Sequence, residues 1–156
     1  MAQTIQQLIK NRIKTKLQAV VDDNSNICLQ EIHEYPALEF GGFPAATITP
    51  IGIEGDAWTN TNDNRNYKFK IRVFYEVSRD RPNSIGDAID ALYDVSDRIM
   101  NTFTDYKTWQ TPTPIQTTLP SGTVFKGVQP VVGEWQQEGE GKLIYVDIEL
   151  AIHLLL

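Results

Sequence analysis

Residues 65–77 alternate between two kinds of side chain, and this long alternation constrains the fold more than any other feature of the chain. The first kind is apolar or aromatic and comprises Tyr67, Phe69, Ile71, Val73, Tyr75 and Val77. The second kind is mostly charged and comprises Lys68, Lys70, Arg72, Phe74 and Glu76. Successive side chains of a β-strand point to opposite faces of its sheet. The alternation therefore predicts one long strand with one buried face and one exposed face.

Two other segments carry apolar residues at three- and four-residue steps, the spacing of an amphipathic helix. In residues 4–21 these positions are Ile5, Leu8, Ile9, Ile13, Leu17 and Val20. In residues 85–103 they are Ile85, Ala88, Ile89, Leu92, Val95, Ile99 and Phe103. Each segment therefore predicts a helix that packs one face against the rest of the protein.

The chain between the first helix and the long strand favours two shorter strands. Residues 27–32 can form a short one. Residues 44–50 form a clearer one, with Pro44 and Pro50 at its borders, where a missing backbone N–H does least harm to a sheet. Residues 52–64 are rich in Asn, Asp and Thr, which predicts a polar loop.

The last third of the chain predicts a β-hairpin. One strand is expected over residues 128–137, a turn of alternating Glu and Gly over 138–141, and a second strand over 143–154. Before it, residues 104–123 are rich in Thr and Pro. A loop of that length in a small domain usually has a binding role or contains a short strand.

The order of these elements predicts the fold class. At 156 residues the chain fits a single domain, residues 1–156, with one hydrophobic core. Helix, strands, helix and strands follow one another. This order indicates an α+β fold with a mostly antiparallel sheet, two helices packed on one face, and a C-terminal β-hairpin.

Composition excludes several classes of function. The net charge is −6, and because the first 21 residues hold four cations and no acid, the remainder sums to −10. An acidic body disfavours sequence-specific DNA binding, which relies on Lys and Arg to displace counterions. The sequence has no apolar run of the roughly 20 residues that span a bilayer and no signal-peptide pattern, so we expect a protein of the reducing cytoplasm with no membrane contact.

No motif for catalysis, metal or cofactor binding is present. Cys28, His33 and His153 lie far apart and lack neighbours that would make a nucleophile or a zinc site, so they are interpreted as core or surface residues. The chain has no nucleophile elbow, phosphate-binding glycine loop or dinucleotide fingerprint. We therefore expect no catalytic residue, no metal and no cofactor, and a protein that is not an enzyme.

Four aspartates form the most specific charge pattern. Asp87, Asp90, Asp94 and Asp97 are spaced three, four and three residues apart, which places them on one side of the second helix, opposite its apolar face. This acidic stripe is either a solvated helix surface or a surface that meets another subunit or lines a channel. Calcium binding is disfavoured, because one rigid helix rarely supplies six to eight converging oxygens.

Lys68, Lys70 and Arg72 project from the exposed side of the long strand and form a basic row. Exposed charges on an edge strand discourage aggregation, which is one explanation of the row. In a ring of identical subunits the row can instead face the acidic stripe of a neighbour, which would fix register and orientation.

Three aromatic residues lie in predicted loops: Trp58, Tyr106 and Trp109. Aromatic residues in loops either fold back on their own domain or anchor a protein partner. The three are therefore candidates for partner docking.

The middle of the chain resembles a known family. The segment Phe43-Pro44-Ala45-Ala46-Thr47-Ile48-Thr49-Pro50, a polar loop, the strand from Asn66 to Glu76, and a helix with Ala91-Leu92-Tyr93-Asp94 and Asp97-Arg98-Ile99-Met100 together resemble the tail terminator, or head-proximal tail completion, proteins of long-tailed bacteriophages. Residues 40–103 carry the resemblance, and the remainder matches in the order of its elements.

The resemblance implies a structural virion protein, assembled in the host cytoplasm. Such a subunit forms a ring, expected to be a hexamer, at the head-proximal end of the tail tube, where it stops tube growth and joins the tail to the neck. Its implied partners are copies of itself, the tail tube protein, the neck or connector protein, and the sheath protein if the tail contracts. DNA would pass through the ring without specific binding, and the acidic stripe is one candidate lining.

Two alternatives stay open. Other head-tail connector or neck proteins have a similar chain length and a similar general character. A small-molecule-binding or enzymatic α+β domain would instead require a concave pocket with shifted ionisable groups.

Overall fold

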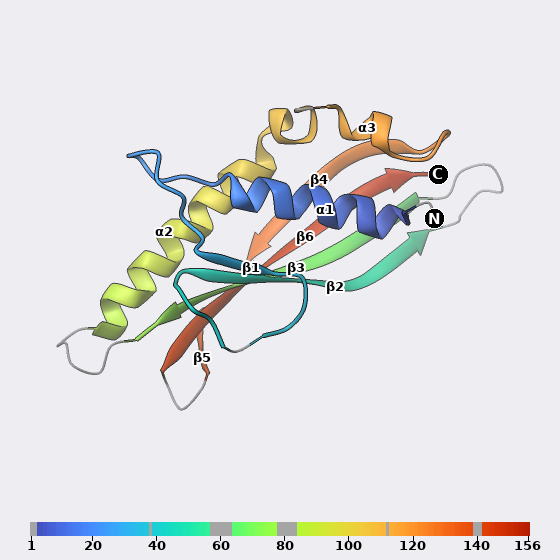
Figure 1. Ribbon diagram of the computed structural model, residues 1–156. Coiled ribbons are helices and arrows are strands. Elements are labelled where there is room, and N and C mark those ends of the chain that lie inside the picture. The colour runs from blue at the N-terminus through green and yellow to red at the C-terminus, as the bar shows by residue number, and fades with distance from the viewer. Residues whose placement is uncertain (1–2, 38, 57–63, 78–83, 112, 139–141) are drawn as a thin grey trace.

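The computed structural model describes residues 3–37, 39–56, 64–77, 84–111, 113–138 and 142–156. A six-stranded sheet carries the helices on one of its faces (Figure 1). The elements in chain order are α1 (Ile5–Gln18), β1 (Glu31–His33), β2 (Ala45–Asp56), β3 (Asn64–Glu76), α2 (Ser84–Thr104), η1 (Tyr106–Trp109), α3 (Ile115–Thr118), β4 (Val124–Val132), β5 (Gln136–Glu138) and β6 (Leu143–Leu155). This is the α+β class that the sequence predicts.

The sheet has the strand order β1-β2-β3-β6-β4, and β5 pairs with β6 beyond the end of β4. All neighbouring strands are antiparallel except β1 and β2, which are parallel. The long alternating strand β3 lies in the middle, between β2 and β6, and is paired with β6 over its full length. Both edges of β3 are therefore occupied by neighbouring strands.

The hydrophobic core lies between the sheet and the helices. α1 contributes Ile9, Ile13 and Leu17. α2 buries most of the apolar face that its spacing predicts, from Ala88 to Phe103, but leaves Ile85 in its first turn 37% exposed. α1 begins at the N-cap Thr4, whose hydroxyl accepts from the Gln7 backbone while the Gln7 side chain accepts from the Thr4 backbone. This capping box satisfies two backbone donors that the first turn leaves free.

The opposite face of the sheet carries no helix, and we call it the helix-free face. Residues 34–37 and 39–44 cross part of it below the sheet (Figure 1). The ring of Phe40 lies 4.9 Å from that of Phe74, and Phe74 is 1% exposed. The sequence assigns Phe74 to the exposed side of its strand. The structure corrects this, because a segment from elsewhere in the chain covers the ring.

The N-terminal part of the sheet differs from the prediction in extent. β1 contains only three residues, of which Glu31 and Ile32 lie in the expected region. Before it, the Asp22 carboxylate accepts from the Asn24 and Asn26 backbone N–H groups in a turn. β2 is longer than expected and continues past Pro50 to Asp56, with a register shift between Pro50 and Gly52. A bulge of this kind lets a strand pass a proline that cannot donate to the ladder.

The C-terminal hairpin forms with one interruption. The strand expected over residues 128–137 is divided into β4 and β5, which pair in succession with the same side of β6. At the break, the Tyr93 hydroxyl of α2 accepts from Trp135 N at 3.1 Å and donates to Gly133 O at 3.3 Å. The segment 104–123 holds η1 and α3 instead of a strand. Among the described helices none is long and apolar enough to cross a bilayer.

Candidate assembly surfaces

The acidic stripe lies on the exposed side of α2. Asp87, Asp90, Asp94 and Asp97 are all exposed, as the helical spacing predicts. Arg98, one turn beyond Asp94, donates to it through Nε at 3.2 Å and to Asp23 through Nη1 at 3.3 Å. The hydrogen bonds to Asp23 and Asp94 raise the pKa of Arg98. These contacts tie α2 to the turn that follows α1.

The other three aspartates of the stripe have no cation within ion-pair distance in the part of the chain that the structure describes. Like charges one helical turn apart repel each other by a few tenths of a kcal/mol. The stripe thus presents a negative surface that, among the described residues, has a cation partner at Asp94 alone.

The basic row lies on the helix-free face, at the centre of the sheet. The interpretation as an edge strand is wrong, because β3 is paired on both sides. Lys68 Nζ lies 2.7 Å from Glu54 Oε1 on β2. Arg72 is paired with Asp147 on β6. Lys70 has no hydrogen-bond or ion-pair partner among the described residues.

The acidic stripe and the basic row lie on opposite sides of the molecule. α2 covers the apolar face of the sheet, while Lys68, Lys70 and Arg72 project from the helix-free face. The two sets therefore cannot meet within one chain. Contact between them, as predicted for a ring of identical subunits, requires two copies.

The structure places the three aromatic residues that the sequence predicts for partner docking differently. Trp58 lies outside the described residues, and Tyr106 begins η1, with a side chain that also lies outside them. Trp109 is 2% exposed, which corrects its assignment as a docking residue. Its indole Nε1 donates to Phe103 O at 3.1 Å, and its ring packs between those of Phe103 and Phe125. Trp109 thus folds back on its own domain.

Trp135 is absent from the predicted docking residues, yet it is 36% exposed. Its backbone N–H is held by Tyr93 in the break between β4 and β5, and its own side chain is left partly at the surface. The sequence around Trp135 is interpreted as one continuous strand, so its exposure is not expected. The nearby Gly133 is a local signal that the strand is interrupted.

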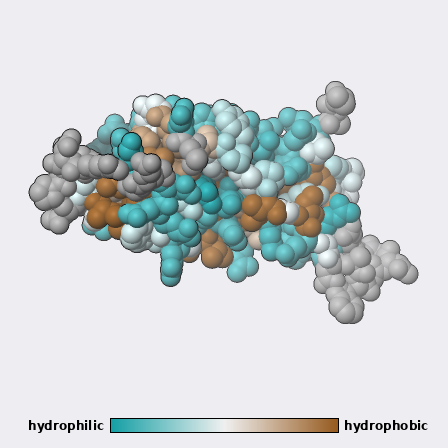
Figure 2. Space-filling model, turned by 90° about the horizontal axis from the view of Figure 1, so that it is seen from below, coloured by the Kyte–Doolittle hydropathy of each residue, from teal (hydrophilic) through white to brown (hydrophobic). Residues whose placement is uncertain are grey.

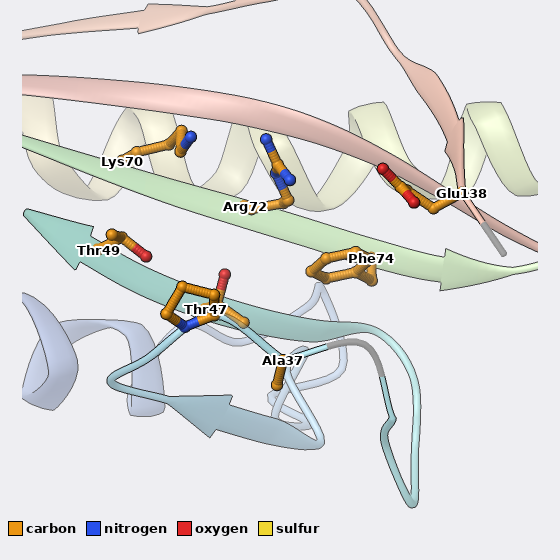
Figure 3. A pocket seen from close by; sticks show the side chains of 8 residues that line it. Ala37, Thr47, Thr49, Lys70, Arg72, Phe74 and Glu138 are labelled. Atoms are coloured by element: carbon orange, nitrogen blue, oxygen red, sulfur yellow. The ribbon is translucent and has the colours of Figure 1, made fainter. Parts of the chain in front are cut away.

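A trough crosses the helix-free face between residues 34–37, β2, β3 and β5. Its volume is about 540 Å³. Its walls are formed by Pro36, Ala37, Thr47, Thr49, Lys70, Arg72, Phe74 and Glu138. Figure 3 shows the side chains from β2 and β3 facing the same space, with Arg72 between Lys70 and Glu138. Hydrophilic residues cover most of this face of the molecule, with separate apolar patches (Figure 2).

The described part of the chain holds potential metal ligands and one thiol. No group of three or more His, Cys, Asp and Glu side chains converges there as a metal site would require. Cys28 is half-buried, and this burial raises the pKa of its thiol. His33 lies beside Glu31 and the rings of Tyr35 and Phe40.

Comparison with known proteins identifies a fold relative and no sequence relative. No protein-family model matches the chain, and no curated protein matches it. Among solved structures, a chain of the particle described as "Virion of native gene transfer agent (GTA) particle" has the same fold, with a TM-score of 0.56 and 12% identity. The similarity covers 95% of this chain and 95% of that chain.

Proposed function

We propose that this chain is a structural virion subunit, a tail terminator that forms a ring at the head-proximal end of a phage tail tube. The observation that carries the proposal is the fold likeness to a chain of a gene transfer agent virion, which extends over 95% of both chains. The resemblance of residues 40–103 to tail terminator proteins points in the same direction. We expect the ring to be a hexamer that stops tube growth and joins the tail to the neck.

The acidic stripe on α2 is the proposed lining of the ring. Asp87, Asp90 and Asp97 are exposed and have no cation partner in the described part of the chain. A negative lumen repels the phosphates of DNA, so the duplex can slide without binding. On the other side of the subunit, the basic row is the proposed contact with a neighbouring copy, and Lys70 is its one cation without a partner among the described residues.

Negative-stain electron microscopy of particles assembled with and without the chain tests the proposal. Without it, we expect tails of uncontrolled length that do not join heads. Complementation with the wild-type chain should restore both length and joining. Tails of normal length, joined to heads in its absence, would reject the terminator function.

The lumen assignment has its own test. The triple variant Asp87→Asn, Asp90→Asn and Asp97→Asn removes three charges from the stripe without touching the Asp94–Arg98 pair. We expect joined particles with slower or incomplete DNA delivery. A matched control carries Glu39→Gln, Glu76→Gln and Glu134→Gln, which changes the net charge equally at exposed positions elsewhere. Equal DNA delivery by both variants would exclude the lumen role.

A second candidate is another connector or neck protein, because the fold likeness is to a chain of a whole particle and names no single component. The same microscopy separates the two candidates. A connector defect leaves tails of normal length that fail to join, whereas a terminator defect also changes tail length.

A further inference from the structure

We propose that the trough on the helix-free face is a binding site for a single carboxylate group attached to a short aliphatic chain. All of its described walls belong to one chain, so a single copy can bind the ligand, and the site shares Lys70 and Arg72 with the surface proposed above to contact a neighbouring copy. It therefore adds a binding activity to the proposed structural function.

Four donors define the polar end of the trough. Thr47 is the register partner of Arg72, and Thr49 is the register partner of Lys70, on the neighbouring strands β2 and β3. Directly opposite side chains on adjacent strands have Cβ atoms about 5 Å apart. The two hydroxyls and two cationic groups therefore form a compact patch, and Figure 3 shows them facing the same space.

Thr47 is the strongest single indication of a ligand. Its side chain lines the trough although the residue is only 3% exposed, and its hydroxyl has no hydrogen-bond partner in the described part of the chain. Every fully buried side-chain nitrogen or oxygen there does have a partner, so the Thr47 hydroxyl reaches the open space of the trough. The hydroxyl can therefore bond to water or to a ligand in the trough, although the rest of the residue is buried.

Arg72 is held in position before any ligand arrives. Its Nε and Nη2 donate to Asp147, and its guanidinium lies over the ring of Tyr145 at 4.1 Å from the centroid. Nη1 makes no hydrogen bond to a described residue and stays available. Because Asp147 already balances the charge of Arg72, Lys70 is the cation on which carboxylate binding depends.

The remaining walls select the size and charge of the ligand. Pro36 and Ala37 offer apolar contact for a short aliphatic chain. Glu138 stands at the other end of the trough, and Glu149 is the register partner of Lys70 on β6. These acids disfavour a dianion such as phosphate more than a monovalent carboxylate. The volume of about 540 Å³ is in the range of small-ligand pockets.

Titration of the isotopically labelled chain with butyrate, followed by NMR at constant ionic strength, tests the site. We expect saturable shifts of the backbone amides of Thr47, Thr49 and Lys70. Butyramide, which has the same shape without the charge, should bind at least tenfold more weakly, and so should inorganic phosphate. Equal binding of butyramide, or no saturable shift at these amides, would overturn the proposal.

Variants locate the binding group. Lys70→Gln should weaken butyrate binding tenfold or more, since a charged donor is lost. The matched control Lys68→Gln removes a cation two residues away on the same face, which pairs with Glu54, and should change binding less than twofold. Thr47→Val and Thr49→Val should each weaken butyrate binding. Because there are two threonine variants, the test still works if one of them fails to fold. Equal effects of the two lysine variants would show that general charge, and no local site, attracts the ligand.

A third experiment, titration with a peptide, identifies the source of the carboxylate. A blocked tripeptide with glutamate at its centre has the same group on a peptide backbone. Binding at least tenfold tighter than butyrate would support a side chain of a docked protein as the natural ligand. Binding no tighter than butyrate would support a free aliphatic acid.

Discussion

The Arg72 guanidinium on β3 holds the Asp147 carboxylate on β6 through two hydrogen bonds, from Nε to Oδ1 at 2.7 Å and from Nη2 to Oδ2 at 3.1 Å. The two residues are direct register partners at the centre of the sheet. This bond to Asp147 raises the pKa of Arg72. A planar two-point contact of this kind requires arginine, since lysine offers a point charge without the fork.

Arg72→Lys should therefore lower the free energy of unfolding by about 1 kcal/mol, although it keeps the charge. Urea denaturation followed by circular dichroism measures the change. Lys68→Gln, which breaks the exposed pair with Glu54, should cost less than about 0.5 kcal/mol. Equal stability of Arg72→Lys and the wild type would contradict a stabilising role for the two-point contact.

Trp109→Ala should be the most destabilising of the tryptophan substitutions among the described residues. It removes a buried ring from between Phe103 and Phe125 and leaves Phe103 O without its donor. We expect a loss of about 3–5 kcal/mol, measured by urea denaturation. Trp135→Ala, at a partly exposed position, is the matched control and should cost less than about 1 kcal/mol. Similar losses for both would mean that Trp109 is not part of the core.

Arg12→Gln should loosen the segment between α2 and α3. The Arg12 guanidinium donates to the carbonyls of Thr111 at 2.9 Å, Thr113 at 2.8 Å and Thr108 at 3.4 Å. Without these bonds, we expect backbone amides of residues 107–111 to exchange hydrogen at least several-fold faster, measured by mass spectrometry. Lys10→Gln, on the same helix and without a partner in the described part of the chain, should leave exchange unchanged. Unchanged exchange in Arg12→Gln would show that the segment is held by its own contacts.

Asp22 should make the stability of the protein depend on acid pH. Its carboxylate accepts hydrogen bonds from the Asn26 and Asn24 backbone N–H groups, and the bond from Asn26 is the largest cause that lowers its pKa. A lowered pKa in the folded state means that the ionised form stabilises the fold. That contribution is complete above the ordinary aspartate pKa of about 3.9 and is lost as the pH falls through the lower folded value.

Asp22→Asn keeps an acceptor oxygen but cannot ionise, so it serves as the reference. The difference in unfolding free energy between the wild type and Asp22→Asn should be constant near neutral pH. It should then shrink as the pH falls below about 4. A difference that stays constant down to a pH of about 2 would contradict the assigned cause.

Much of the fold follows from local patterns. Alternation in residues 65–77 and three- to four-residue spacing in residues 85–103 predict β3 and α2 to within one residue at each end, because long periodic segments can satisfy their burial in one way only. Helix α1 ends earlier than its apolar spacing suggests, since Asp22 organises a turn after it. The split between β4 and β5 depends on Tyr93, a residue of α2 that no local pattern connects with Trp135.

Local periodicity predicts the fold class, the buried faces of β3 and α2, and the exposed acidic stripe, because it fixes which side chains share a face. Packing between distant segments sets which charges are compensated, places β3 at the centre of the sheet, buries Trp109 and Phe74, and brings Thr47, Thr49, Lys70 and Arg72 to one trough. These properties depend on which distant segments become neighbours. Strand order, register and the path of residues 39–44 set those neighbours through long-range packing, which single-residue patterns do not encode.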